Sequence, residues 1–135
     1  MTRFAGSFDA GVAMAAKIDL YSFFMRASPE LRAARKYDYG DPVINADRFR
    51  ALSPVTYANR VRDPILLVLG GQDPKVSLSD ADEFVRRLRR RKQDVSLEIV
   101  PALGHKTETP DEISLADARI VDFFAEKLDA NTGLQ

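Results

Sequence analysis

Two residues with complementary chemistry, Asp73 and His105, stand out in this sequence of 135 residues. His105 is the only histidine, and imidazole is the side chain that most readily exchanges a proton near neutral pH. A carboxylate held against one imidazole nitrogen fixes the tautomer and leaves the other nitrogen to accept a proton from a serine. The pair could therefore be the acid and the base of a serine-hydrolase catalytic triad, if the fold brings them together.

Each of the two residues follows a predicted strand. The apolar residues 65–69 lie between Pro64 and two glycines, which predicts a buried strand that ends shortly before Asp73. Residues 95–100 alternate in polarity, which predicts an edge strand that ends shortly before His105. Because right-handed crossovers place the carboxyl ends of successive parallel strands side by side, we expect Asp73 and His105 to meet there.

The remaining pattern predicts an α/β fold with about three parallel strands and flanking helices. The small apolar residues 10–16 indicate a first strand that is covered on both faces. A crossover helix with Ser79 as its N-cap has an apolar face made of Ala81, Phe84, Val85 and Leu88. A last helix, opened by Pro110, carries an apolar stripe of Ile113, Ala116, Ile120, Phe123, Phe124 and Leu128. Residues 129–135 are expected to form a flexible tail.

The long connection over residues 17–63 is rich in aromatic residues and interrupted by prolines. It predicts short helices over the carboxyl ends of the strands, where open α/β sheets bind their ligands. The aromatic residues in 21–24 can line a substrate pocket or belong to the core, and a core position is the commoner role.

The composition excludes several classes of function. Twenty basic residues balance twenty acidic ones, so no global field favours nucleic acid. The basic residues in 86–92 share a predicted helix with Asp80, Asp82 and Glu83, which favours a solvated face. The longest apolar run is far shorter than the roughly 20 residues that cross a bilayer. The absence of cysteine excludes disulfides and thiol catalysis but leaves the cellular compartment open.

Several motifs resemble the prolyl oligopeptidase family of serine peptidases, which includes acylaminoacyl- and dipeptidyl-peptidases. They are Phe8-Asp9-Ala10-Gly11-Val12-Ala13, Tyr39-Gly40-Asp41-Pro42, Leu52-Ser53-Pro54, Gly70-Gly71-Gln72-Asp73-Pro74-Lys75-Val76 and Gly104-His105. The resemblance implies the C-terminal part of an α/β-hydrolase catalytic domain over residues 1–128. It also implies that Asp73 and His105 are the triad acid and base, that a peptide or ester is hydrolysed through an acyl-enzyme, and that no metal ion or organic cofactor takes part.

The nucleophile of such a triad sits in a Gly-x-Ser-x-Gly turn, which this sequence does not contain. Ser7 is the nearest candidate, but the glycine before it is one place off and no strand precedes it. We therefore expect the chain to be inactive alone and to need a missing N-terminal half, in cis or in trans. Without that half, the strand at residues 10–16 has an unpaired edge. We therefore expect copies of the chain to associate through this edge.

Two other interpretations fit the same residues. The chain could be a non-catalytic α/β interaction module or a truncated relic, or it could be part of an esterase-type α/β-hydrolase. The sequence does not separate a peptidase from an esterase, because the substrate pocket would depend on residues outside it.

Overall fold

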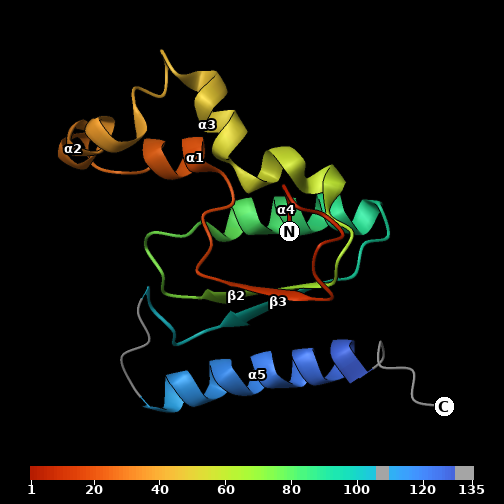
Figure 1. Ribbon diagram of the computed structural model, residues 1–135. Coiled ribbons are helices and arrows are strands. Elements are labelled where there is room, and N and C mark those ends of the chain that lie inside the picture. Colours follow the sequence, from red (N-terminus) through yellow and green to blue (C-terminus); the bar gives the residue numbers. More distant parts are fainter. Residues whose placement is uncertain (106–109, 130–135) are drawn as a thin grey trace.

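The computed structural model describes residues 1–105 and 110–129. The elements, in chain order, are β1 (Gly11–Met14), α1 (Leu20–Met25), α2 (Pro29–Tyr39), α3 (Ala46–Leu52), the 3-10 helix η1 (Pro54–Arg60), β2 (Ile65–Gly70), α4 (Leu78–Arg90), β3 (Val95–Val100) and α5 (Pro110–Asp129). Figure 1 shows them as layers, with α5 on one face of the sheet and α4 on the other, and with the helices of residues 20–60 outside α4.

The sheet is parallel throughout, in the order β1-β2-β3. All six residues of β2 are buried because this strand lies in the middle, between two neighbours and two helical layers. β3 lies at an edge, as its alternating pattern predicted. The predicted α/β fold with three parallel strands and flanking helices is thus confirmed.

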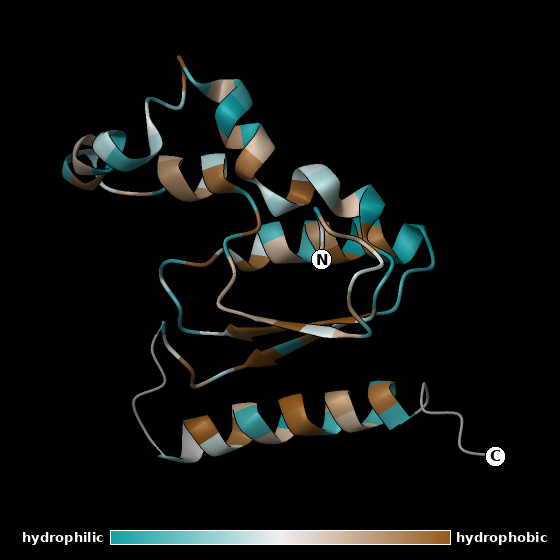
Figure 2. Cartoon of the chain, in the orientation of Figure 1, coloured by the Kyte–Doolittle hydropathy of each residue, from teal (hydrophilic) through white to brown (hydrophobic). Residues whose placement is uncertain are grey.

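Alternate residues of β2 face opposite sides and build two apolar cores. Leu67 and Leu69 pack with the apolar face of α4, which includes Phe84 and Leu88. Leu66 and Val68 pack on the other side with α5. Figure 2 shows hydrophobic and hydrophilic residues alternating along α4 and α5, as expected for helices with one buried face.

The stripe predicted for α5 is buried only in its central part. Ala116 and Phe123 are buried, and Ile120 and Phe124 pack against the same core. Ile113 and Leu128, at the two ends of the stripe, are exposed because the helix extends beyond the short strands that it covers. Of the predicted tail, Asp129 is the last residue of α5, and residues 130–135 lie outside the described part of the chain.

Three local predictions are wrong in detail. The first strand covers only Gly11–Met14, because Ala15 has a φ of 44°, which ends the extended conformation. The N-cap of α4 is Ser77 rather than Ser79, since the Ser77 hydroxyl accepts the backbone N–H of Asp80. The alternation over residues 95–100 predicts that Ile99 shares the better buried face of β3 with Val95 and Leu97. Ile99 is instead 42% exposed, because the core under α4 extends along β3 only through Val95 and Leu97.

The connection over residues 17–63 forms short helical elements, as predicted. α1 packs against α3, and the rings of Phe24 and Phe49 meet edge to face with centroids 5.3 Å apart. η1 packs on the outer side of α4, so part of this connection covers a helix rather than the strand ends. The core interpretation therefore holds for Phe24, whose side chain is buried inside this layer.

Candidate active site

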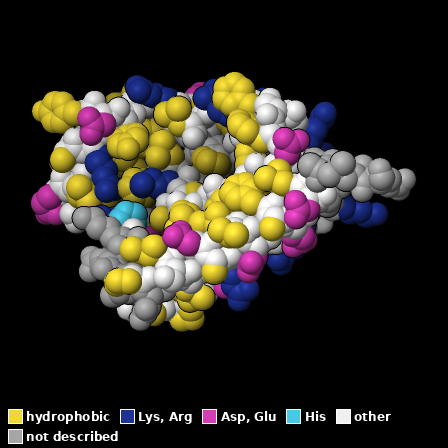
Figure 3. Space-filling model, turned by 60° about the horizontal axis from the view of Figure 1, so that its bottom comes forward, with side chains coloured by type: hydrophobic (Ala, Val, Ile, Leu, Met, Phe, Trp, Pro, Cys, Tyr) yellow, Lys and Arg dark blue, Asp and Glu magenta, His cyan; other side chains and the backbone are white. Residues whose placement is uncertain are grey.

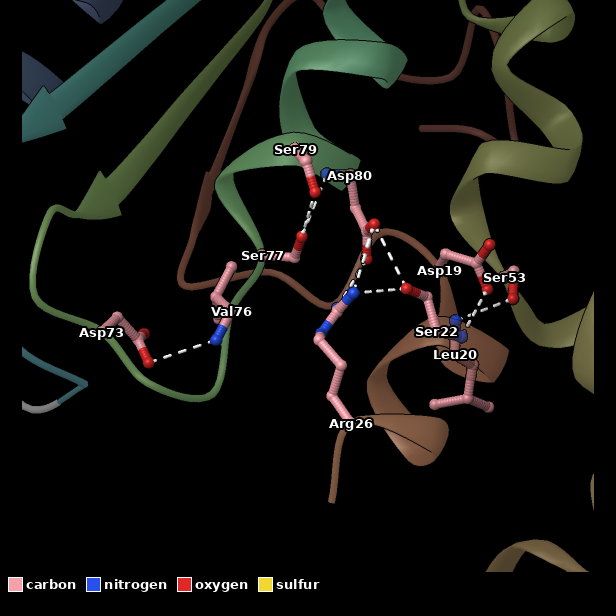
Figure 4. Close-up of polar contacts among 10 residues, drawn as sticks. All are labelled: Asp19, Leu20, Ser22, Arg26, Ser53, Asp73, Val76, Ser77, Ser79 and Asp80. Atoms are coloured by element: carbon pink, nitrogen blue, oxygen red, sulfur yellow. Dashed lines mark hydrogen bonds and ion pairs between the residues drawn. The ribbon is translucent and has the colours of Figure 1, made fainter. Parts of the chain in front are cut away.

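Asp73 lies in the turn that joins β2 to α4. Its Oδ1 accepts the backbone N–H groups of Lys75 at 2.7 Å and Val76 at 3.2 Å. Figure 4 shows the contact with Val76, just before Ser77 begins α4. Aspartate favours such turns because its short side chain reaches backbone donors two or three residues ahead. These contacts fix the carboxylate and leave Oδ2 to accept another donor.

The turn that carries Asp73 is joined to the loop that carries His105 by the backbone. Gly71 N–H donates to the carbonyl of Val100 at 2.9 Å, and Gln72 N–H donates to that of Leu103 at 3.0 Å. These bonds continue the pairing of β2 and β3 past the ends of the strands. The two loops are therefore held together independently of their side chains.

Gly70 allows the close approach of these loops. A Cβ atom added at this position would lie 2.6 Å from the carbonyl oxygen of Gly104 and closer still to that of Leu103. Both contacts would be with backbone atoms, which cannot turn aside as a flexible side chain can. A side chain at this position would thus push the histidine loop away from Asp73.

The result is a hydrogen bond of 2.9 Å between His105 Nδ1 and Asp73 Oδ2, across 32 positions of the chain. The side chain of Asp73 is 1% exposed and that of His105 is 26% exposed. The structure brings together the two site residues predicted from the sequence, with the Asp73 carboxylate enclosed and the His105 imidazole partly exposed.

The electrostatics of the pair favour an ionised acid. Burial raises the pKa of Asp73, but the hydrogen bonds from His105 and from the backbone N–H groups of Lys75 and Val76 together hold it below its ordinary value. An ionised carboxylate can only accept hydrogen bonds. Nδ1 of His105 is therefore the donor, and Nε2 carries the lone pair that a general base needs.

A cleft of about 390 Å³ opens beside the histidine. Its walls come from the carboxyl ends of β1 and β2 and from the histidine loop, with lining residues Met14, Ala15, Val68, Gly70, Leu103, Gly104 and His105. Figure 3 shows a hollow with largely hydrophobic walls next to the cyan histidine. The cleft places a small, mostly apolar space next to the base.

Ser7 is far from this arrangement. It is exposed, and the preceding residue, Gly6, donates its backbone N–H to both carboxylate oxygens of Asp63, at 3.0 and 3.1 Å. Asp63 precedes β2, so Ser7 lies near the amino ends of the strands, whereas His105 lies beyond their carboxyl ends. In residues 1–105 and 110–129, no serine hydroxyl forms a hydrogen bond with His105.

Two basic residues of α4, Arg86 and Arg87, form ion pairs with acidic residues of the same helix. Arg86 lies 3.1 Å from Asp82 and 2.8 Å from Glu83, and Arg87 lies 2.9 Å from Glu83. Such pairs at helical spacing are typical of a solvated surface. Within the described part of the chain, no three potential metal ligands of the His, Cys, Asp or Glu type lie together. No helix there is both long and apolar enough to span a bilayer.

One polar cluster beside the site had no signal in the sequence. Arg26, the C-cap residue of α1, lies 2.6 Å from Asp80 of α4, and the hydroxyl of Ser22 donates to the same carboxylate at 3.2 Å. Figure 4 shows Ser22 and Arg26 directed together toward Asp80. Because 54 positions separate Arg26 from Asp80, no periodicity or local spacing links them. The cluster fastens α1 to the start of α4, just past the turn that holds Asp73.

Comparison with known proteins gives the same fold and order of elements. The structure superposes on the acylaminoacyl peptidase of Pyrococcus horikoshii with a TM-score of 0.79 and 23% identity, over 92% of this chain and 21% of that one. It superposes on a puromycin-hydrolyzing peptidase of Mycobacterium tuberculosis with a TM-score of 0.77 and 21% identity, over 90% of this chain and 19% of that one. These structures are α/β-hydrolases, which confirms the predicted fold class.

The sequence is also similar to curated peptidases. It is 30% identical over 80 residues to dipeptidyl peptidase family member 6 of Caenorhabditis elegans, which is 59% of this chain and 11% of that protein. It is 30% identical over 63 residues to the acylamino-acid-releasing enzyme of Arabidopsis thaliana, which is 47% of this chain and 8% of that protein. The chain thus spans about a tenth of the length of these relatives.

The model of the prolyl oligopeptidase family matches residues 1–131, almost the whole sequence. The resemblance seen in the motifs around Asp73 and His105 is therefore confirmed, and the chain belongs to the prolyl oligopeptidase family of serine peptidases.

Proposed function

We propose that this chain supplies the acid and the base of a serine-peptidase triad, Asp73 and His105. The observation that carries the proposal is the 2.9 Å hydrogen bond between His105 Nδ1 and a carboxylate that is itself fixed by two backbone N–H groups. This is the geometry in which an aspartate orients a histidine and stabilises the imidazolium that forms during catalysis.

In the proposed reaction, Nε2 of His105 accepts the proton of a serine hydroxyl while the serine oxygen attacks the carbonyl carbon of a peptide bond. The imidazolium then donates that proton to the leaving amine as the carbon–nitrogen bond breaks. Water, deprotonated by the same nitrogen, attacks the acyl-enzyme and releases the carboxylic acid, and the proton returns to the serine. Asp73 remains ionised throughout.

The serine of this triad comes from a segment other than residues 1–135, in cis or in trans. Ser7 does not fit the role because it lies near the amino ends of the strands, whereas His105 lies beyond their carboxyl ends. The open edge of β1 is the place for the strand that carries the nucleophile. Gly11 and Ala15 direct their N–H groups toward β2, so Val12 and Met14 direct theirs outward.

A peptide is the favoured substrate class, because the similar proteins are named as dipeptidyl, acylaminoacyl and puromycin-hydrolyzing peptidases. The role of the chain is then that of a partial catalytic domain, residues 1–128, and its activity requires the rest of the enzyme.

Reconstitution with a serine-reactive fluorophosphonate tests this function. The chain alone should show no stable labelling, and the chain combined with a serine-bearing N-terminal segment of a family hydrolase domain should be labelled on that serine. Asp73→Asn and His105→Gln should each lower the labelling rate by at least about 100-fold, since general-base catalysis typically contributes 10²–10⁴. Labelling unaffected by either change would favour a non-catalytic interaction module. Labelling of the chain alone, lost in Ser7→Ala, would contradict the assignment of the nucleophile.

A further inference from the structure

The ring of Phe23, in α1, holds two cations. Lys17 Nζ lies 4.9 Å from the ring centroid, and Arg35 Cζ lies 4.4 Å from it. The side chain of Phe23 is buried, so the ring is a fixed surface rather than a mobile one. The negative face of an aromatic ring attracts cations, and here both cations lie within 5 Å of the centroid of one ring.

Neither cation has a carboxylate partner among residues 1–105 and 110–129. Other basic residues of the same connection do have one: Arg26 lies 2.6 Å from Asp80, and Lys36 lies 2.6 Å from Asp41. The aromatic contact offsets only part of the charge on Lys17 and Arg35. Two positive charges around one ring, with no anion between them, make a local site of positive potential.

Lys17 is close in the chain to the cleft beside His105. Lys17 comes two residues after Ala15, which lines the cleft. Ser22, the neighbour of Phe23 in α1, donates a hydrogen bond to Asp80 at the start of α4, which follows the turn of Asp73. Figure 3 shows basic side chains next to the histidine at the hollow, and Figure 4 shows how α1 is attached beside the acid loop.

We propose that Lys17 and Arg35 form an anion-binding subsite that recognises a carboxylate on the substrate. The inference rests on the proposed function and adds the substrate class: peptides that carry aspartate or glutamate near the scissile bond. A carboxylate gains from both cations, whereas the isosteric carboxamide of glutamine has the same size and no charge. The aromatic wall beside the cations excludes water on one side and so strengthens this attraction.

A binding experiment on the intact chain tests the subsite without requiring catalysis. The probes are acetyl-glutamate α-amide and acetyl-glutamine α-amide, titrated at low ionic strength and followed by backbone NMR shifts. The glutamate probe should bind about tenfold more tightly, a difference of about 1.4 kcal/mol, with shifts at residues 15–17 and around Arg35. Lys17→Met and Arg35→Met should each remove most of this preference.

Arg48→Met is the matched control. Arg48 is an exposed basic residue of α3, in the same connection, and this variant also loses one positive charge. It should keep the preference for glutamate. Equal binding of the two probes, or an equal loss in Arg48→Met and Lys17→Met, would overturn the subsite.

The experiments can contradict the subsite proposal and the triad proposal independently. The preference for glutamate should persist in Asp73→Asn, because that residue does not contact the two cations. If the preference is present and reconstituted labelling is absent, the triad proposal fails alone. If labelling is present and the preference is absent, the acidic subsite fails alone.

Discussion

Oδ2 of Asp73 lies 2.9 Å from Nδ1 of His105, and the backbone carbonyl groups that bring them together belong to the histidine loop. The backbone N–H groups of Gly71 and Gln72 donate to the carbonyl groups of Val100 and Leu103, so the backbone joins the loop of Asp73 to the loop of His105. The geometry of the pair therefore depends on backbone packing, and most of all on the missing side chain of Gly70.

Gly70→Ala should both destabilise the chain and break the pair. The new Cβ would press on the carbonyl oxygens of Leu103 and Gly104, and overpacking of this kind typically costs 1–3 kcal/mol. Urea unfolding measures the loss, and the NMR signals of the His105 ring report whether its hydrogen bond survives.

Gly6→Ala is the control for this change. Gly6 has a φ of +78° but no atom within 4 Å of an added Cβ, so it tests backbone strain without overpacking. Gly6→Ala should lower the free energy of unfolding by a smaller amount, about 1 kcal/mol. The NMR signals of the His105 ring should remain unchanged in this variant. A greater loss in Gly6→Ala than in Gly70→Ala would contradict the role of the close approach.

The stability contributed by Asp73 should depend on pH in the acid range. Since the folded-state pKa lies below the ordinary 3.8, the folded protein favours the ionised form more than the unfolded chain does. This stability is fully present above about pH 4 to 5. It decreases as the pH falls through 3.8 and is lost below the lowered pKa of the folded state.

Unfolding free energies of the natural chain and of Asp73→Asn, compared between pH 2 and 7, measure this contribution. The difference between the two proteins should shrink as the pH falls. A difference that stays constant over the whole range would show that the hydrogen bonds to the carboxylate do not favour its ionised form.

Ser77→Ala should destabilise α4 more than Ser79→Ala does. The Ser77 hydroxyl accepts the backbone N–H of Asp80, and loss of an N-cap typically costs about 1 kcal/mol. Among residues 1–105 and 110–129, the one side-chain hydrogen bond of Ser79 is with the Ser77 hydroxyl. Ser79→Ala should therefore lower the free energy of unfolding by only about 0.3 kcal/mol. Thermal unfolding of the two variants compares them, and equal effects would argue against Ser77 as the cap.

Lys92→Gly should stabilise the protein by about 0.5–1 kcal/mol, because Lys92 follows α4 with a φ of 57° and glycine adopts this conformation without strain. Arg91→Gly, one residue earlier at a φ of −97°, should give no such gain. Chemical denaturation measures the stability of both variants. A loss of stability in Lys92→Gly would contradict the strain argument.

Self-association through β1 remains a prediction. The outward N–H groups of Val12 and Met14 belong to an open edge, and Met14 is 44% exposed, so two copies can pair along it. Light scattering at increasing concentration should show dimers or larger species. Met14→Lys should suppress them, because a charge on an edge strand opposes pairing. A monodisperse monomer at high concentration would count against this edge as an interface.

The positions of Asp73 and His105 were predictable because they depend on order along the chain. An apolar run such as residues 65–69 has few alternatives to a central strand, and the handedness of crossovers then places the two following loops at the same edge. Motifs around the two residues added the family, which the family match confirms. Their catalytic roles stay proposals, because no serine hydroxyl among residues 1–105 and 110–129 forms a hydrogen bond with His105.

Only the tertiary structure decided the details that depend on distant or competing groups. Ser77 and Ser79 both suit an N-cap, and packing of the loop selected Ser77. The need for glycine at position 70 comes from carbonyl groups more than 30 residues away, and the Arg26–Asp80 pair joins segments that share no local pattern. The sequence by itself determined the order of the three strands and the presence of helices on the sheet, because those follow from local periodicity. Close contacts between loops required the assembled fold, since they depend on backbone atoms whose positions no single segment specifies.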